Sequence, residues 1–408
     1  MMQQENKQSN IVIIGAGPAG SYTARHLAML GIKTDVYEEH HKIGLPSHCA
    51  GHISIHSLKK LGYYPLPKGI IENTFNAANF YSPSGTKFSI HLKKPVTCAL
   101  NRTKFDQYIA DQAKQAGATF HVGSTVKSLQ IENNYVKGVN LQDNNTIIPS
   151  KITIDAEGIS SRLLRQTKLG GLDRKGLVYA VETEIDQVHD VEPHAVEVYM
   201  GSSAPGFYAW LIPRPDGTAK LGLATNHGNP QNYLKNLMTK HPVAKKQVKG
   251  AKIITTNYHA IPLAGPISQA YSNGFLAVGD VASQVKPTTG GGVIFGLTCG
   301  KIAADVAKTA LDLGDVSAKT LSLYQKRCNA ALNFDVTFML RLRRFLNSLS
   351  DERWDSVLRF CNRFGVGRAL SDVEEIDYQG RMMMHVATKP AMIAALGYFG
   401  LLYLFANP

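Results

Sequence analysis

The sequence predicts an α/β fold that combines a parallel sheet, an antiparallel sheet and a helical C-terminal region in one chain. Three observations predict it. An apolar run at 11–14 leads straight into a glycine-rich turn at 15–20, after which apolar residues recur with helical spacing. Short runs with strand character follow one another across residues 177–224. Residues 326–408 again have helical periodicity.

The glycine-rich turn predicts a Rossmann-type dinucleotide site. Gly15 allows the tight turn, Gly17 lets a pyrophosphate approach the backbone, and Gly20 lets the helix pack on the strand. The phosphates would then lie at the helix N-terminus, where free N–H groups favour anions. A second predicted strand ends at Glu38, where a carboxylate can bind a ribose diol.

Three further segments favour FAD over a nicotinamide dinucleotide. Arg102 opens a predicted helix, Asp155 ends a strand in a glycine turn that leads to Arg162, and a buried strand ends at Asp280, which is suited to bind ribityl hydroxyls. In this order the segments resemble the FAD-binding fold of the para-hydroxybenzoate hydroxylase superfamily, which is of the glutathione reductase type. A capping turn or a surface ion pair stays the alternative for Asp155 and Arg162. No second G-x-G-x-x-G motif follows another strand, so a separate nicotinamide domain is not expected.

A second glycine loop, at 287–292, enters a predicted helix that runs to about residue 311. Backbone N–H groups in such a loop would lie beside the isoalloxazine ring and stabilise negative charge on its N1–C2=O edge. A site of this kind favours hydride donation by reduced flavin. A plain helix N-terminus is the alternative.

The motifs together resemble those of the geranylgeranyl reductase family, to which digeranylgeranylglycerophospholipid reductases belong. They are Cys49-Ala50-Gly51, Tyr208-x-Trp210-x-Ile212-Pro213, and Gly279-Asp280 with Pro287-x-Thr289-Gly290-Gly291-Gly292, and the likeness covers residues 9–345. Members of the family are FAD enzymes that saturate isoprenoid double bonds, in archaeal ether lipids or in geranylgeranyl diphosphate and chlorophyll side chains. The resemblance therefore implies an FAD-dependent reductase that acts on geranylgeranyl chains by hydride transfer.

The glycine turn and the resemblance together predict the site residues, with Val126 beside the adenine. The predicted FAD-binding residues are Gly15, Gly17, Ala19, Gly20, Glu38, Cys49, Ala50, Arg102, Val126, Asp280, Gly291, Gly292 and Val293. The predicted substrate-binding residues are Tyr208, Trp210 and Pro213. The chain departs from the family at His52, where a second glycine is usual, and at Ile212-Pro213-Arg214, where Phe-Pro-Lys is usual.

An isolated alkene has no carbonyl to accept hydride, so one route is protonation with hydride arriving from flavin N5. Cys49 is the predicted catalytic residue on the proton path, with His52 next. The π faces of Tyr208 and Trp210 could stabilise developing positive charge by ~1–2 kcal/mol when desolvated. An inert packed thiol and a hydrogen-bonded loop histidine are the alternatives. No C-x-x-C pair occurs, so no metal site is predicted.

Composition limits the partners. The chain has 408 residues, 44% of them hydrophobic, and a formal net charge of +13, which indicates a globular protein with a basic surface. No nucleic-acid module is visible. The charge fits an anionic membrane surface, a phosphorylated substrate or an acidic electron donor, with plain solubility as the alternative. The five scattered cysteines predict reduced thiols, and a polar N-terminus predicts no signal peptide, so we expect a cytoplasmic protein, peripheral at the inner face of the membrane.

The predicted domains are discontinuous. The FAD-binding domain takes residues 1–72, 96–165 and 265–325; the substrate domain, an antiparallel sheet, takes 73–95 and 166–264; the helical region takes 326–408 with an apolar tail at 391–406. The tail is uncharged, and sixteen helical residues span ~24 Å, short of a ~30 Å hydrocarbon layer. A monotopic anchor or lid and a buried closing helix both stay open.

Two other functions are possible on this fold. A flavin monooxygenase or halogenase is the first, since tryptophan halogenases carry Trp-x-Trp-x-Ile-Pro where this chain has Tyr208 first. A membrane-associated electron-transfer flavoprotein is the second. The sequence leaves the external electron donor open among ferredoxin, NADPH and a deazaflavin.

Overall fold

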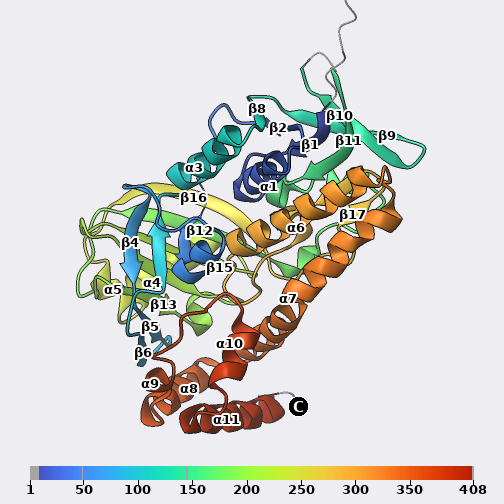
Figure 1. Ribbon diagram of the computed structural model, residues 1–408. Coiled ribbons are helices and arrows are strands. Elements are labelled where there is room, and N and C mark those ends of the chain that lie inside the picture. The colour runs from blue at the N-terminus through green and yellow to red at the C-terminus, as the bar shows by residue number, and fades with distance from the viewer. Residues whose placement is uncertain (1–8, 48, 144–145, 407–408) are drawn as a thin grey trace, which may run out of the picture.

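The computed structural model describes residues 9–47, 49–143 and 146–406. Within these residues the chain forms a parallel-type sheet, a second and mostly antiparallel sheet beside it, and a helical C-terminal region below both (Figure 1). The N-terminal strand lies in the first sheet and the last helix lies at the opposite end of the molecule. This arrangement confirms the predicted fold class.

The first sheet has the strand order β17-β18-β11-β1-β2-β8, with β10 and β9 extending from β11. Its strands are β1 (Ser9–Ile14), β2 (Thr34–Glu38), β8 (Thr119–Val122), β9 (Val126–Glu132), β10 (Tyr135–Leu141), β11 (Ile147–Asp155), β17 (Tyr271–Ser272) and β18 (Phe275–Ala277). The strands β8, β2, β1, β11 and β18 run parallel. Ile11, Val12 and Ile13 are fully buried, as expected of a central parallel strand.

Three helices pack together beside this sheet: α1 (Pro18–Met29), α3 (Arg102–Gln115) and α6 (Val293–Asp312). Pro18 occupies the first turn of α1, where its missing N–H costs nothing. The side chain of Asn101 caps α3 by accepting a hydrogen bond from the Lys104 N–H at 3.0 Å. Helix α3 therefore begins at the predicted residue, Arg102, whereas α1 begins at Pro18, three residues before the predicted start at Ser21.

The second sheet has the order β16-β12-β15-β14-β13-β5-β6. Its strands are β5 (Ala77–Tyr81), β6 (Lys87–His91), β12 (Leu177–Ile185), β13 (Ala195–Tyr199), β14 (Ala209–Pro213), β15 (Ala219–Thr225) and β16 (Ile253–Pro262). All neighbours are antiparallel except β13 and β5, which run parallel. The helices α4 (Pro230–Lys240) and α5 (Ala244–Gln247) follow β15.

A small third sheet connects the two larger ones. It consists of β3 (His52–Ser54), β7 (Thr97–Leu100) and β4 (Ile71–Phe75), with α2 (Ile55–Lys60) after β3. Strands β1, β2, β8, β11 and β18 come from segments assigned to the FAD-binding domain, and β5, β6 and β12 to β16 from those assigned to the substrate domain. The domain boundaries themselves stay predictions.

The C-terminal region consists of α7 (Ala318–Asn347), α8 (Asp351–Arg363), α9 (Val366–Ala369), α10 (Gln379–Val386) and α11 (Pro390–Ala406). The long helix α7 runs from the first sheet down to the other four helices (Figure 1). Its residues Met339 and Phe345 are buried, so this helix covers the core. In α11, Ala395 is buried whereas Ile393 and Leu401 are more than half exposed. Among the residues described, no helix has the length and apolar character needed to cross a membrane.

Candidate functional site

A long cleft lies where the first sheet meets the second, at the carboxyl ends of β1, β2 and β11. It consists of two cavities, of about 300 Å³ and about 230 Å³. Gly17, Gly44, Pro46 and Ala156 line both cavities, so the two form one elongated site. Crevices at this edge of a parallel sheet are the usual place for a dinucleotide.

Most of the predicted FAD-binding residues line this cleft. The smaller cavity, here the nucleotide end, is lined by Gly15, Gly17, Glu38 and Val126. The larger cavity, here the ring end, is lined by Gly17, Ala19, Cys49, Arg102, Asp280, Gly292 and Val293. Gly20, Ala50 and Gly291 line neither cavity. The individual cofactor contacts stay predictions.

The three glycines of the first turn have different surroundings. Gly15 has a φ of 94°, and a Cβ there would lie 2.5 Å from the Ala156 carbonyl oxygen. A Cβ at Gly20 would lie 2.0 Å from the Gly15 carbonyl oxygen, which no side chain tolerates. Among the residues that the structure describes, a Cβ at Gly17 would meet nothing within 4 Å. Gly15 and Gly20 are thus required by the protein's own packing, whereas Gly17 faces the open cleft.

Glu38 closes the nucleotide end. Its Oε2 accepts a hydrogen bond from the Ala16 N–H at 2.8 Å, and its Oε1 lies 2.6 Å from His40 Nδ1. The carboxylate is therefore held at the end of β2 beside the glycine turn. This is the position in which a carboxylate meets a ribose diol.

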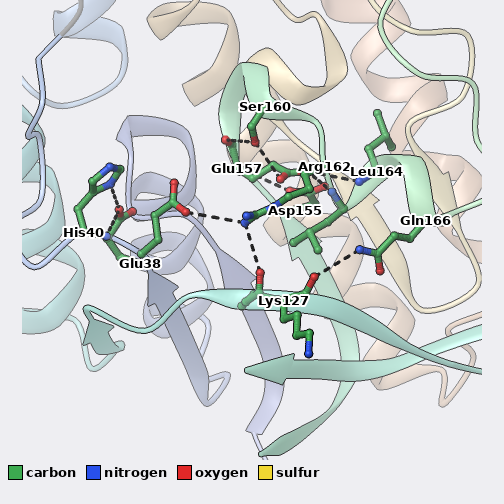
Figure 2. A network of polar contacts seen from close by, with 12 residues as sticks. Glu38, His40, Lys127, Asp155, Glu157, Ser160, Arg162, Leu164 and Gln166 are labelled. Carbon is green, nitrogen blue, oxygen red and sulfur yellow. Dashed lines mark hydrogen bonds and ion pairs between the residues drawn. The ribbon is translucent and has the colours of Figure 1, made fainter. Parts of the chain in front are cut away.

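Figure 2 shows the polar network on the opposite side of the nucleotide end. The Glu157 carboxylate accepts the N–H groups of Leu163 and Leu164, at 2.6 and 3.3 Å, and so holds the turn after β11. Asp155 is fully buried and accepts the Glu157 N–H at 3.0 Å; burial and then the neighbouring Glu157 raise its pKa. Asp155 supports the turn, whereas Arg162 lines the cleft and donates to the Val126 carbonyl.

At the ring end, the second glycine loop packs closely between the side chains of Asp280 and Phe207. A Cβ at Gly292 would lie 2.6 Å from Asp280 Oδ1, and one at Gly290 would lie 3.3 Å from the Phe207 ring. The Asp280 carboxylate lines the cavity and has no hydrogen-bond partner among the residues described, and burial raises its pKa. A ribityl hydroxyl would satisfy it.

Helices α1 and α6 join the two glycine loops. A Cβ at Gly296 of α6 would lie 3.3 Å from Ala19 Cβ of α1, and one at Gly300 would lie 2.5 Å from Thr23 Oγ1. Helix α6 therefore packs closely against α1 through two of its glycines, which are four residues apart and lie on the same face of α6. This contact holds the turn of residues 15–20 against the loop of residues 290–292.

Cys49 and Arg102 lie together at the ring end. The Cys49 sulfur accepts a hydrogen bond from the Gly51 N–H at 3.4 Å. The Arg102 guanidinium makes a two-pronged contact with the Asp106 carboxylate, with both distances 3.1 Å. Asp106 neutralises the arginine, so the positive charge next to Cys49 is largely balanced within the protein.

His52 lies at the start of β3, outside the lining of both cavities. Its Nε2 is 2.7 Å from Thr97 Oγ1. Part of the residue stays accessible to solvent, yet desolvation of the ring and then the charge of Lys286 lower its pKa to about 4. The imidazole is thus neutral at pH 7. The role of His52 on the proton path stays a prediction. In that role the ring would act in its neutral form, hydrogen-bonded to Thr97.

The aromatic motif is divided between two environments. The Tyr208 hydroxyl donates to the Thr289 carbonyl at 2.9 Å, so this ring touches the second glycine loop. Trp210 is buried and its Nε1 donates to Glu182 Oε2 at 3.1 Å. Pro213 ends β14, and its carbonyl accepts a hydrogen bond from Asn73 at 2.9 Å, outside both cavities of the cleft.

Several residues of the ring end carry no signal in the sequence. These residues are His259, Ala260 and Ile261, which line it from β16. The β16 residues reach the cleft because β16 pairs with β12, far away in sequence. Nothing in the local pattern of residues 259–261 predicts that placement.

Known proteins share both the sequence and the fold. The family model described as FAD binding domain matches residues 8–298. Digeranylgeranylglycerophospholipid reductase 2 of Methanothermobacter thermautotrophicus is 33% identical over 378 residues, which cover 90% of this chain and 94% of that protein. The chain belongs to this reductase family.

Solved structures agree. A geranylgeranyl bacteriochlorophyll reductase-like protein of Thermoplasma acidophilum matches with a TM-score of 0.84 and 26% identity, covering 96% of this chain and 99% of that one. The flavin-dependent brominase Bmp2 matches with a TM-score of 0.69 and 19% identity, over 92% of this chain and 93% of that one, which shows the shared fold alone. The predicted family, FAD cofactor and oxidoreductase class are confirmed.

The cleft fits FAD on its own geometry. The open face of Gly17 leaves room for a pyrophosphate, and the Asp280 carboxylate, which has no partner within the described part of the chain, leaves an acceptor for the ribityl chain. Glu38 and Val126 would hold the adenosine half, and the loop of residues 290–292 would face the ring.

Exchanging the glycines of the first turn should separate cofactor binding from folding. We expect Gly17→Ala to fold as the wild type does but to bind FAD at least tenfold more weakly, because the new methyl group enters the phosphate space, a steric cost of about 1–3 kcal/mol. Gly20→Ala should instead lower the free energy of unfolding by about 3 kcal/mol or more, since its methyl group meets backbone. Thermal denaturation with FAD fluorescence titration measures both. Equal effects of the two variants on folding would contradict this assignment.

Proposed function

We propose that this protein saturates the isoprenoid C=C bonds of an anionic lipid, with geranylgeranyl chains of an ether phospholipid as substrate and geranylgeranyl diphosphate as the alternative. The observation that carries the proposal is the ring end of the cleft, where Cys49 and the second glycine loop meet beside Tyr208. The name of the relative that is 33% identical supports the same substrate. Bound FAD, once reduced, would supply the hydride.

The side chains at the ring end would supply the rest of the chemistry. Cys49 lines the cavity and would give a proton to one alkene carbon. Tyr208 and Trp210 lie with their rings 5.9 Å apart in an edge-to-face pair, and their π faces would stabilise positive charge that develops on the other carbon. Ile261 adds apolar surface that excludes water.

A third cavity, of about 370 Å³, lies next to the ring end with the Tyr208–Thr289 contact between them. Arg343 lines it and lies over the Phe207 ring at 5.6 Å. No carboxylate among the described residues forms an ion pair with Arg343, and burial lowers its pKa to about 10. Asp351 also lines the cavity, but the N–H and hydroxyl of Ser202 hold its carboxylate.

An arginine that is partly desolvated and lacks a counter-ion is suited to bind an anion. We therefore infer that the phosphate of the lipid binds at Arg343, with a prenyl chain passing Tyr208 towards the ring end. Both candidate substrates carry such a phosphate.

Contact with a membrane surface is the second part of the proposal. Met384 of α10 is 60% exposed, and Ile393 and Leu401 of α11 are 58% and 56% exposed. Apolar side chains on a terminal helix, in a chain with a net charge of +13, fit a peripheral protein on anionic lipid. A lipid substrate would then enter from the membrane side.

The electron donor stays open among ferredoxin, NADPH and a deazaflavin. The alternative function is a flavin monooxygenase or halogenase; a solved flavin-dependent brominase shares the fold with this chain. Rapid oxidation of NADPH with release of peroxide would favour that alternative.

Anaerobic reduction of lipid tests the function. We expect the dithionite-reduced holoprotein to add two mass units per double bond to digeranylgeranylglycerophospholipid or to geranylgeranyl diphosphate, measured by mass spectrometry. The better substrate identifies the lipid class.

Cys49→Ser is the matched variant for this experiment. It should keep FAD bound and lose most of the turnover, because a serine hydroxyl is a far weaker acid than a thiol. Wild-type holoprotein that changes neither lipid would contradict the reductase, and full turnover of Cys49→Ser would remove Cys49 from the proton path.

Arg343→Gln tests the phosphate site. Loss of a charge-assisted contact worth about 1.5–3 kcal/mol should raise KM for the phospholipid by about 10- to 100-fold with little change in kcat. Arg341→Gln, an exposed position on the same helix, is the control and should change neither. An unchanged KM in Arg343→Gln would place the phosphate elsewhere.

Vesicle flotation tests the membrane contact. We expect the protein to float with anionic vesicles at low salt and to lose this binding in the double variant Ile393→Asp and Leu401→Asp. Leu313→Asp, an exposed apolar position outside α10 and α11, should bind as the wild type does. Equal binding by all three proteins would contradict a membrane surface on α11.

A further inference from the structure

A small polar cavity lies behind Cys49, on the side of the second sheet. Its volume is about 100 Å³, room for a few water molecules. Cys49 and Arg102 line one side of it, and Glu182, Glu184 and Asn257 line the other. It shares Ser47, Cys49 and Arg102 with the ring end of the cleft, so Cys49 faces both spaces.

Glu182 is buried in the middle of this sheet, at 5% exposure. In the strand register Glu182 lies opposite Gly222, and Gly222 lies opposite Trp210. A Cβ at Gly222 would lie 2.6 Å from the Trp210 ring, so only glycine lets the indole cross this strand and reach the acid. The indole N–H donates to Glu182 Oε2 at 3.1 Å.

Trp210 thus separates two environments. Its ring belongs to an apolar cluster with Phe75, Val196 and Phe207, on the side expected to hold the lipid. Its N–H points to the carboxyl of Glu182 in the polar cavity. A carboxyl group buried behind this apolar cluster needs a reason, because burial of a charge is costly.

The other charged groups around Glu182 are largely engaged with one another. Lys220 of β15 donates to the carbonyls of Ala50 and Leu100, both at 3.1 Å, and lies 2.9 Å from Glu72. Arg214 pairs with Glu72 at 3.3 Å and with Glu184 at 2.6 Å.

The side chain of Glu184 is 34% exposed, so the cavity meets solvent at this side. The pKa of Glu182 is raised to about 7, mainly because the carboxyl group is buried. The positive charge of Lys220 and the hydrogen bond from Trp210 act in the opposite direction and lower it.

We propose that Glu182 is a proton-relay residue that returns protons to Cys49 through water in this cavity. The inference rests on the proposed function, in which the Cys49 thiol protonates an alkene carbon. That step breaks the S–H bond, forms a C–H bond and leaves a thiolate. The Glu182 carboxylic acid then passes its proton through water to the thiolate, and the resulting carboxylate takes a proton from solvent at the Glu184 side. No electrons move in these steps; the hydride comes from reduced FAD.

The rate kcat should depend on pH, because only the protonated form of Glu182 can donate a proton. Below pH 7 Glu182 carries its proton and kcat should be constant. Above pH 7 the proton is lost and kcat should fall. Glu182→Gln keeps an acceptor for the Trp210 N–H but has no proton to give. We expect its kcat to drop about 100-fold, the size of a lost acid–base contribution. KM and FAD affinity should stay unchanged, with no inflection near pH 7, and Glu182→Asp should recover part of the rate.

Glu197→Gln is the matched control, because Glu197 is equally buried in the same sheet but does not line the polar cavity. It should keep the wild-type rate and pH profile. A second readout needs no turnover: the infrared band of a protonated carboxyl group should titrate near pH 7 in the wild type and be missing in Glu182→Gln.

An unchanged rate and pH profile in Glu182→Gln, beside an active wild type, would overturn the relay alone. A wild type that reduces no lipid would overturn the proposed function and the relay with it, whatever the infrared titration shows. An infrared band that survives in Glu182→Gln would assign the titration to another group and also overturn the relay.

Discussion

The close approach of α1 and α6 is the contact on which the site depends. Gly296 and Gly300 of α6 lie against Ala19 and Thr23 of α1: a Cβ at Gly300 would lie 2.5 Å from Thr23 Oγ1, and one at Gly296 would touch Ala19 Cβ tightly at 3.3 Å. The two helices begin at glycine turns more than 250 residues apart in the chain, and their contact brings both turns to one cleft. A bulkier residue at either glycine would separate the nucleotide end from the ring end.

Contacts from α7 and from the segment that contains Asp377 and Gln379 also hold the ring end in place. Tyr324 of α7 donates to the Ala277 carbonyl at 2.8 Å and accepts from Gln284, which in turn binds the Gly279 N–H. The second glycine loop is bound to the C-terminal region by the ion pair of Lys286 with Asp377 and by the Thr288–Gln379 hydrogen bond of 2.8 Å. The helical region, the cofactor loop and the first sheet therefore form one continuous structure.

Sequence reasoning predicts the parts of the site that are local. The turn with Gly15, Gly17 and Gly20, the strand end at Glu38 and the acid at Asp280 each depend on a few consecutive residues, and all but Gly20 line the cleft. Gly20 packs against the turn itself.

Placement that depends on long-range pairing could not be predicted. The β16 residues and Glu182 reach the site only through strand register across the second sheet. For the same reason Pro213, which follows the aromatic residues in sequence, lies outside the cleft at the end of β14. His52 is adjacent to the cysteine loop in sequence, but pairing of β3 with β7 turns it towards Thr97.

We propose that the cleft orients FAD with its reacting ring between Cys49 and the second glycine loop. A crystal structure of the FAD complex tests it most directly. We predict the adenine beside Val126, the pyrophosphate over Gly17, and the isoalloxazine ring with its N1–C2=O edge at the loop of residues 290–292 and Cys49 near one face. A flavin bound in the reverse direction, or with its ring outside the cavity lined by Cys49 and Val293, would contradict the account.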